Sequence, residues 1–157
     1  MQQRWAALVT VLALSAFLPR LAAAQASTPS TPGASQDRGS KAELGQNSPN
    51  PFTTDTRIPF TVGDYPTCSD PGRVYQISLR VYDILTQLVA VPVLQGGSGS
   101  VTEGKPLENM KLPCGQYLAY WDAKNSNTGQ QVMAGVYLYR LEVDGRPIAK
   151  KMLYSNK

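Results

Sequence analysis

The stretch WDAKNSNTGQQVMAGVYLYRL, residues 121–141, holds the end of one predicted strand, a connection rich in turn-forming residues, and the start of a second strand. Leading into it, Tyr117, Ala119 and Trp121 alternate with their neighbours at the period of two that is typical of a strand. The same period returns at residues 135–143. Because such strands bury one face, the stretch predicts a sandwich in which a second sheet covers that face.

Similar patterns occur upstream of this stretch. Residues 74–83 alternate cleanly, and a tight turn at 83–86 leads to a returning run at 87–94, so together they predict a β-hairpin. Residues 57–62 also alternate. Pro59 in this run has no N–H to donate to a ladder, which predicts an edge strand.

The rest of the chain favours an all-β fold. Pro and Gly are frequent, and no run with helical periodicity follows the first 25 residues. We expect a flexible loop at residues 95–100 and a short strand at 107–112, which gives an antiparallel β-sandwich of about seven strands. The core is predicted to contain large apolar and aromatic residues, namely Phe52, Phe60, Leu79, Val81, Trp121, Tyr137, Tyr139 and Leu141.

The N-terminal residues have the form of an export signal. A basic start precedes an apolar run at residues 5–18, and small residues follow. We predict a signal peptide at residues 1–24 with cleavage between Ala24 and Gln25, and Ala26 is the second choice. The run is shorter than the roughly 20 residues that span a bilayer, so no membrane span is expected in the mature form. An uncleaved anchor is the alternative. The mature protein is predicted to be secreted, at the cell surface or in the periplasm.

Residues 25–46 are rich in Ser, Thr, Pro, Gly and Ala without apolar periodicity, so we predict a disordered linker before a domain at residues 47–157. Whether the linker carries glycans stays open. Losing Arg4 and Arg20 with the signal peptide lowers the formal net charge from +4 by two, to +2. This charge is too small to indicate nucleic-acid binding.

Cys68 and Cys114 are the two cysteines of the chain. In an exported protein two cysteines are expected to form a disulfide. Two free thiols or an intermolecular bridge are the alternatives. The long separation of Cys68 and Cys114 in sequence argues against a redox-active pair, because the two cysteines of such a pair are usually close in sequence.

No pattern for catalysis or a cofactor is present. The sequence has no histidine, which removes Ser-His-Asp and Cys-His arrangements. Its 11 acidic residues are scattered, mostly at predicted turns. Asp122, Asn125 and Asn127 resemble part of a calcium loop, but their spacing does not fit one, and plain turns are preferred. We expect no enzyme, no metal and no cofactor.

An exposed aromatic row for stacking on sugars would draw on the strand tyrosines Tyr75, Tyr82, Tyr120 and Tyr139. Core positions and cross-strand pairs are the preferred interpretation of these residues.

Several motifs together resemble a known family. They are QNSPNPF at 46–52, TRIPF at 56–60, LRVYDILTQLV at 79–89, the stretch at 121–141 and AKKM at 149–152. Their order resembles the FlgD-like immunoglobulin-type domain and is closely similar to the C-terminal sorting domain of cargo of the type IX (Por) secretion system. The resemblance implies an immunoglobulin-like sandwich.

In this comparison Tyr137 stands where a tyrosine corner is expected. Two positions depart from the family pattern. Thr86 and Ala123 stand where the family usually has glycine. Because a β-branched residue disfavours positive φ, we predict a turn of a different type at Thr86.

The resemblance also implies a function. It indicates an exported, non-catalytic module that acts in secretion targeting or surface attachment, through a protein partner in the export machinery or a surface assembly. The basic end of the chain makes Lys150, Lys151 and Lys157 the candidate partner contacts. The alternative is a stand-alone structural or adhesive binding module of a cell-surface or filament assembly, held by strand addition.

Overall fold

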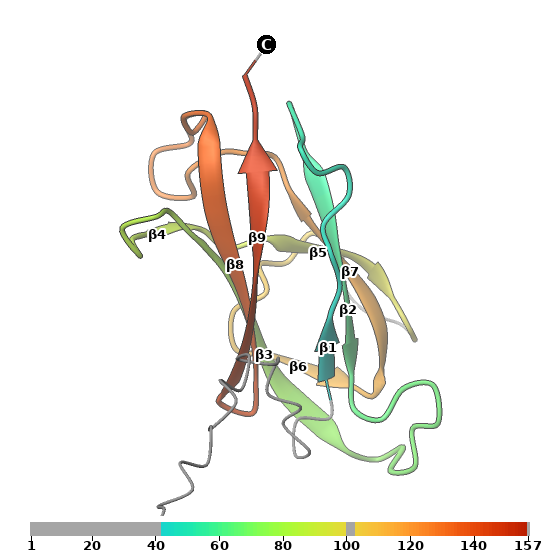
Figure 1. The fold of residues 1–157 in the computed structure, drawn as a ribbon. Coiled ribbons are helices and arrows are strands. Elements are labelled where there is room, and N and C mark those ends of the chain that lie inside the picture. The colour runs from blue at the N-terminus through green and yellow to red at the C-terminus, as the bar shows by residue number, and fades with distance from the viewer. Residues whose placement is uncertain (1–41, 100–102, 157) are drawn as a thin grey trace, which may run out of the picture. The chain divides into compact units, whose positions relative to one another are not determined.

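The structure is a computed structural model and describes residues 42–99 and 103–156. Within these residues the chain forms nine strands and no helix, and every strand ladder is antiparallel (Figure 1). The strands are β1 (Ala42–Leu44), β2 (Thr56–Val62), β3 (Val74–Tyr82), β4 (Leu88–Ala90), β5 (Val93–Gly97), β6 (Met110–Pro113), β7 (Gly115–Trp121), β8 (Gly135–Val143) and β9 (Arg146–Tyr154).

The strands form two sheets. One has the order β1-β2-β7-β5, and the other has the order β4-β3-β8-β9, with β6 also paired to β3. The β8–β9 hairpin turns at Asp144 and Gly145, which have φ of 50° and 78°. An Asp-Gly pair with both φ values positive is the favoured two-residue hairpin turn. The predicted antiparallel β-sandwich is confirmed.

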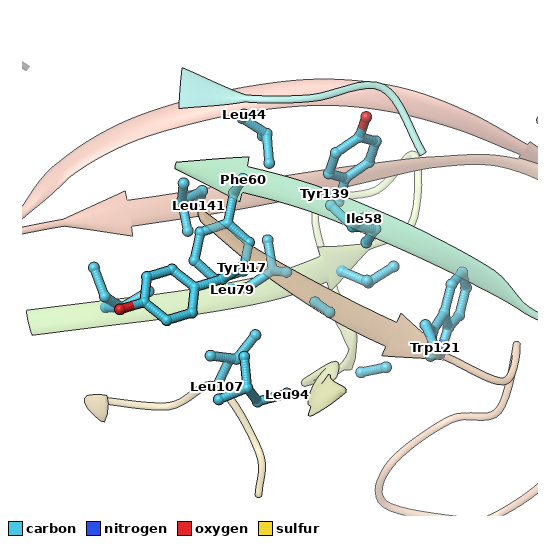
Figure 2. Packing of buried hydrophobic residues seen from close by; sticks show 14 of the residues in the cluster. Leu44, Ile58, Phe60, Leu79, Leu94, Leu107, Tyr117, Trp121, Tyr139 and Leu141 are labelled. Atoms are coloured by element: carbon cyan, nitrogen blue, oxygen red, sulfur yellow. The ribbon is translucent and has the colours of Figure 1, made fainter. Parts of the chain in front are cut away.

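The inward faces of both sheets form one apolar core. Figure 2 shows Leu79, Tyr139 and Leu141 of one sheet facing Ile58 and Tyr117 of the other. All eight residues predicted for the core are buried. Alternation dictates this result, because residues two apart on a strand share a face.

Aromatic rings close one end of the core. Trp121 meets Phe52 edge-on at 5.6 Å between ring centroids and meets Tyr137 at 5.5 Å. Phe52 lies outside the long strands, and its backbone bonds to β9: its N–H donates to the Leu153 carbonyl, and its own carbonyl accepts from Ser155 N–H. These contacts fix Phe52, one of the predicted core residues, at this end of the core.

The linker prediction is wrong for its last residues. Ala42–Leu44 forms β1, which pairs with β2, and Leu44 is buried in the core. Composition does not reveal this strand, because Leu44 is a single large apolar residue in a polar segment. The signal peptide at 1–24, its cleavage site and the linker residues 25–41 lie outside the described residues.

The edge-strand prediction for β2 is also wrong, because β2 lies between β1 and β7. The Pro59 carbonyl accepts a hydrogen bond from Gly45 N–H, just past the end of β1. An antiparallel residue directs its N and its carbonyl to the same side. The missing N–H of Pro59 therefore faces the end of β1, and the ladder with β7 loses nothing.

The run predicted at 87–94 divides into two strands in different sheets. β4 ends at Ala90, and β5 begins at Val93 and pairs with β7. Pro92 lies at the crossing, where its missing N–H costs no ladder bond. The flexible loop predicted at 95–100 is wrong for Gln95–Gly97, since these residues belong to β5.

The short strand predicted at 107–112 begins three residues later and ends one residue later, as β6 (Met110–Pro113). Leu107 precedes this strand and is fully buried, with its carbonyl accepting from Leu79 N–H. The apolar character of Leu107 thus marks a core contact made from a loop.

Candidate binding surface

The predicted disulfide between Cys68 and Cys114 is confirmed, with an S–S distance of 2.04 Å. It joins the β2–β3 connection to the residue between β6 and β7. Gly63 makes room for it, because a Cβ there would lie 2.8 Å from the Cys114 Sγ. The bridge ties the two sheets together at the end of the sandwich that lies away from Trp121.

Polar side chains of the long β7–β8 connection accept hydrogen bonds from backbone N–H groups of the same connection. Asn125 Oδ1 accepts from the N–H groups of Asn127 and Thr128, and Asp122 Oδ1 accepts from Lys124 N–H. These bonds match the preferred interpretation as turns. Within residues 42–99 and 103–156, no three His, Cys, Asp or Glu side chains gather in a way that could hold a metal ion.

The four strand tyrosines do not form an exposed row. Tyr75 and Tyr139 are buried, and Tyr82 and Tyr120 are half-buried. The Tyr139 hydroxyl donates to the Gly45 carbonyl at 2.9 Å and accepts from Asn47 N–H at 3.1 Å. Burial raises its pKa, while the bond from Asn47 acts in the opposite direction.

Tyr137 forms the expected tyrosine corner. Its hydroxyl donates to the carbonyl of Met133, four residues upstream, at 2.6 Å. Burial raises the pKa of Tyr137, and the nearby Asp83 and Tyr154 add to this effect. Tyr117 makes the same bond to the Pro113 carbonyl at 2.8 Å, a second corner that the sequence reasoning missed.

The β3–β4 turn presents two apolar side chains to solvent. Asp83 Oδ1 accepts from the N–H groups of Leu85 and Gln87 and so closes the turn. Ile84 and Leu85 at its tip are 73% and 70% exposed. The sequence indicates this exposure, because Ile84 and Leu85 lie inside a predicted tight turn and turns lie at the surface.

Further exposed apolar residues lie at the same end of the sandwich. Met133 is 83% exposed, and Val136 on β8 pairs with Leu153 on β9. A hollow of about 540 Å³ lies between the β3–β4 turn and the end of the β7–β8 connection. We call this surface the apolar end, which consists of Ile84, Leu85, Leu88, Met133, Val136 and Leu153.

The apolar end continues across the outer face of the sheet that contains β9. Cross-strand pairing places Tyr82 beside Leu138, and Leu138 beside Lys151. The Arg140 guanidinium lies over the Tyr82 ring, 5.5 Å from its centroid. This arrangement is a cation–π contact, and it places a positive charge at the border of the apolar end.

Two of the three predicted partner contacts lie on β9. Lys150 pairs with Tyr139 and Lys151 pairs with Leu138, so the two side chains leave opposite faces of the strand. Lys157 lies outside the described residues. Among the described residues, neither Lys150 nor Lys151 forms an ion pair with an acidic group.

Comparison of the chain with protein-family models, with curated proteins and with solved structures gave no match. The similarity to the FlgD-like and type IX sorting domains therefore stays a prediction from the order of sequence motifs. In the part of the chain that the structure describes, no helix has the length and apolar character needed to cross a membrane.

Proposed function

We propose that this protein is an exported, non-catalytic β-sandwich module that binds a protein partner in secretion targeting or surface attachment. The apolar end is the observation that carries the proposal. Six of the eight large hydrophobic residues exposed in the described part of the chain belong to it. A contiguous exposed apolar patch on a folded domain marks a surface that another molecule covers.

Two further observations support this function. The hollow beside Ile84 and Met133 offers a concave place for an apolar side chain of the partner. The Cys68–Cys114 disulfide is of the kind that persists in oxidising compartments outside the cytoplasm. The resemblance to sorting domains of exported cargo points to the same location.

The test is the double variant Ile84→Ser with Leu85→Ser, produced from the full-length gene in the source organism. Both side chains are exposed, so the domain is expected to stay folded, while the contact area with the partner falls. We expect the amount at the cell surface and in the medium to drop about tenfold, with accumulation in the periplasm, since losing about 1.4 kcal/mol of affinity gives this factor.

Val74→Ser is the matched control. Val74 is 56% exposed at the opposite end of the strand that leads to Ile84, so this variant removes exposed apolar area away from the apolar end. Its distribution should equal that of the unmodified protein. Normal export of a folded Ile84/Leu85 variant would contradict the proposal.

A further inference from the structure

Two edge strands of the sandwich, β4 and β5, are covered by other parts of the chain. Ser126 covers β4: its N–H donates to the Val89 carbonyl, and its hydroxyl oxygen accepts from Val91 N–H. Lys105 and Gly104 cover β5 through bonds to the N–H and carbonyl of Leu94. Covered edges prevent unwanted strand pairing.

The second half of the β9 edge is covered in the same way. Phe52 N–H donates to the Leu153 carbonyl at 3.0 Å, and Asn50 Oδ1 accepts from Leu153 N–H at 2.9 Å. Gln46 Nε2 donates to the Lys151 carbonyl at 3.1 Å. The backbone groups of Leu153 and the Lys151 carbonyl therefore point away from β8.

In the part of the chain that the structure describes, the first half of this edge makes no backbone hydrogen bond to another strand, although β1 packs near β9. Successive residues of an antiparallel strand point their N–H and carbonyl groups to alternate sides. Since Leu153 and Lys151 point outward, Ala149 and Pro147 do too. Among residues 42–99 and 103–156, the Ala149 N–H and carbonyl and the Lys151 N–H have no hydrogen-bond partner. Pro147 fits this side because it has no N–H.

Positive charge concentrates on the same strand. Five cationic side chains of the described residues form ion pairs, namely Arg57, Arg73, Arg80, Lys124 and Arg140. Five do not, and three of these are on β9: Arg146, Lys150 and Lys151. Because Lys150 and Lys151 leave opposite faces, an incoming strand would meet a positive charge on each face.

These charges decide between two occupants of the edge. A second copy of this chain would bring its own Arg146, Lys150 and Lys151 onto the same short stretch, and like charges across strands destabilise pairing. An acidic segment would instead complement them. We propose that the open edge of β9 receives an extended, acidic segment of a partner protein as an added strand.

In this complex the N–H groups of Ala149 and Lys151 donate to carbonyls of the incoming segment. The carbonyls of Pro147 and Ala149 accept from its N–H groups. Carboxylates on alternate faces of the segment pair with Lys150 and Lys151. Backbone bonds supply affinity, and the charges supply selectivity. The inference rests on the proposed function in naming a protein partner, but it concerns a different surface from the apolar end.

The test uses the purified mature protein and two synthetic ten-residue peptides. One carries pairs of adjacent glutamates between valine and threonine, so that an extended strand presents carboxylates on both faces, and the other has lysine in place of glutamate. Binding is measured by fluorescence polarisation, and hydrogen exchange of backbone amides is followed by NMR. We expect the acidic peptide alone to bind, to weaken as salt rises, and to slow exchange at the amides of Ala149 and Lys151.

Two variants test the two parts of the site. Ala149→Pro removes the outward N–H without removing a bond to β8, and should weaken binding about fivefold or more, as expected for one lost hydrogen bond. Lys150→Glu with Lys151→Glu should abolish binding of the acidic peptide. The matched control is Lys105→Glu with Lys111→Glu, which changes two exposed, unpaired lysines elsewhere and should leave binding unchanged.

Several results would overturn the inference. They are protection of the Ala149 amide in the free protein, equal binding of the lysine peptide, and unchanged exchange at the amides of Ala149 and Lys151 when the acidic peptide is bound. The peptide experiment measures binding at the β9 edge and does not depend on the apolar end. If the Ile84/Leu85 variant is exported normally but the acidic peptide still binds the β9 edge, the proposed function is wrong and this inference stands. If the variant loses export but the peptide does not bind, this inference is wrong and the proposed function stands.

Discussion

Replacing Thr86 by glycine is expected to stabilise the domain. Thr86 has a φ of 60°, in the left-handed region, and its side chain is exposed. Its N–H donates to the Asp83 carbonyl at 3.1 Å, a bond that glycine keeps. A left-handed conformation costs a residue with a Cβ about 1–2 kcal/mol. Glycine avoids this cost but adds freedom to the unfolded chain, worth about 0.4–1 kcal/mol. The expected net gain is about 0.5–1 kcal/mol.

The assay is equilibrium unfolding of the oxidised mature protein in urea, with thermal unfolding beside it. The Thr86→Gly variant should raise the urea midpoint without changing the slope. The melting temperature should rise by about 2–5 °C for a domain of this size. Thr53→Gly is the control, because Thr53 is also exposed but lies outside the positive-φ positions. It should lose about 0.5–1 kcal/mol.

The difference in unfolding free energy between Thr86→Gly and Thr53→Gly tests whether the backbone at Thr86 is strained. If Thr86→Gly destabilises the protein as much as Thr53→Gly does, Thr86 does not bear the strain that its φ implies. The prediction of a different turn type at Thr86 is wrong, because the structure shows this threonine in the backbone conformation that favours glycine.

Three other predictions concern stability. Replacing Cys68 and Cys114 by serine should cost about 4 kcal/mol in urea unfolding, from the loop that the bridge closes; a loss below about 1 kcal/mol would contradict this. Gly97→Ala should cost about 1–3 kcal/mol, because its Cβ would overlap the Tyr117 ring and lie 2.8 Å from Cε1; unchanged stability would show that the ring moves freely. Burial raises the pKa of Tyr117 and Tyr137 above the usual 10.0, so the folded state holds their protons more tightly. Stability should be full below about pH 10 and fall above it, and Tyr137→Phe should make the fall shallower in melting curves from about pH 8 to about pH 11.

The sequence anticipated the features that depend on neighbours within one strand. Alternation at residues 74–83 and 135–143 identified β3 and β8 and their buried faces. It failed where a strand changes sheet, at Pro92, since both halves of the run are apolar and only their partners differ. It also failed for Ala42–Leu44, because so short a strand exists only through its pairing with β2.

The candidate surfaces divide in the same way. The lysines of β9 were identified from charge alone, but the sequence could not show that Ala149 lies on an open edge beside them. That edge depends on the path of residues 46–52. Within the described part of the chain, this segment hydrogen-bonds to Lys151 and Leu153 but leaves the backbone groups of Ala149 without a hydrogen-bond partner.

The amino-acid sequence by itself determined that this chain forms paired strands with one apolar face each, closed by a cysteine pair. The tertiary structure alone decided which strands are neighbours, that Thr86 and Ala123 adopt positive φ, and that Ile84, Met133 and Val136 line one hollow. The reason is physical: burial of one face is set by a residue's neighbours along the chain, whereas edges, strained turns and surface patches arise from contacts between residues far apart in sequence.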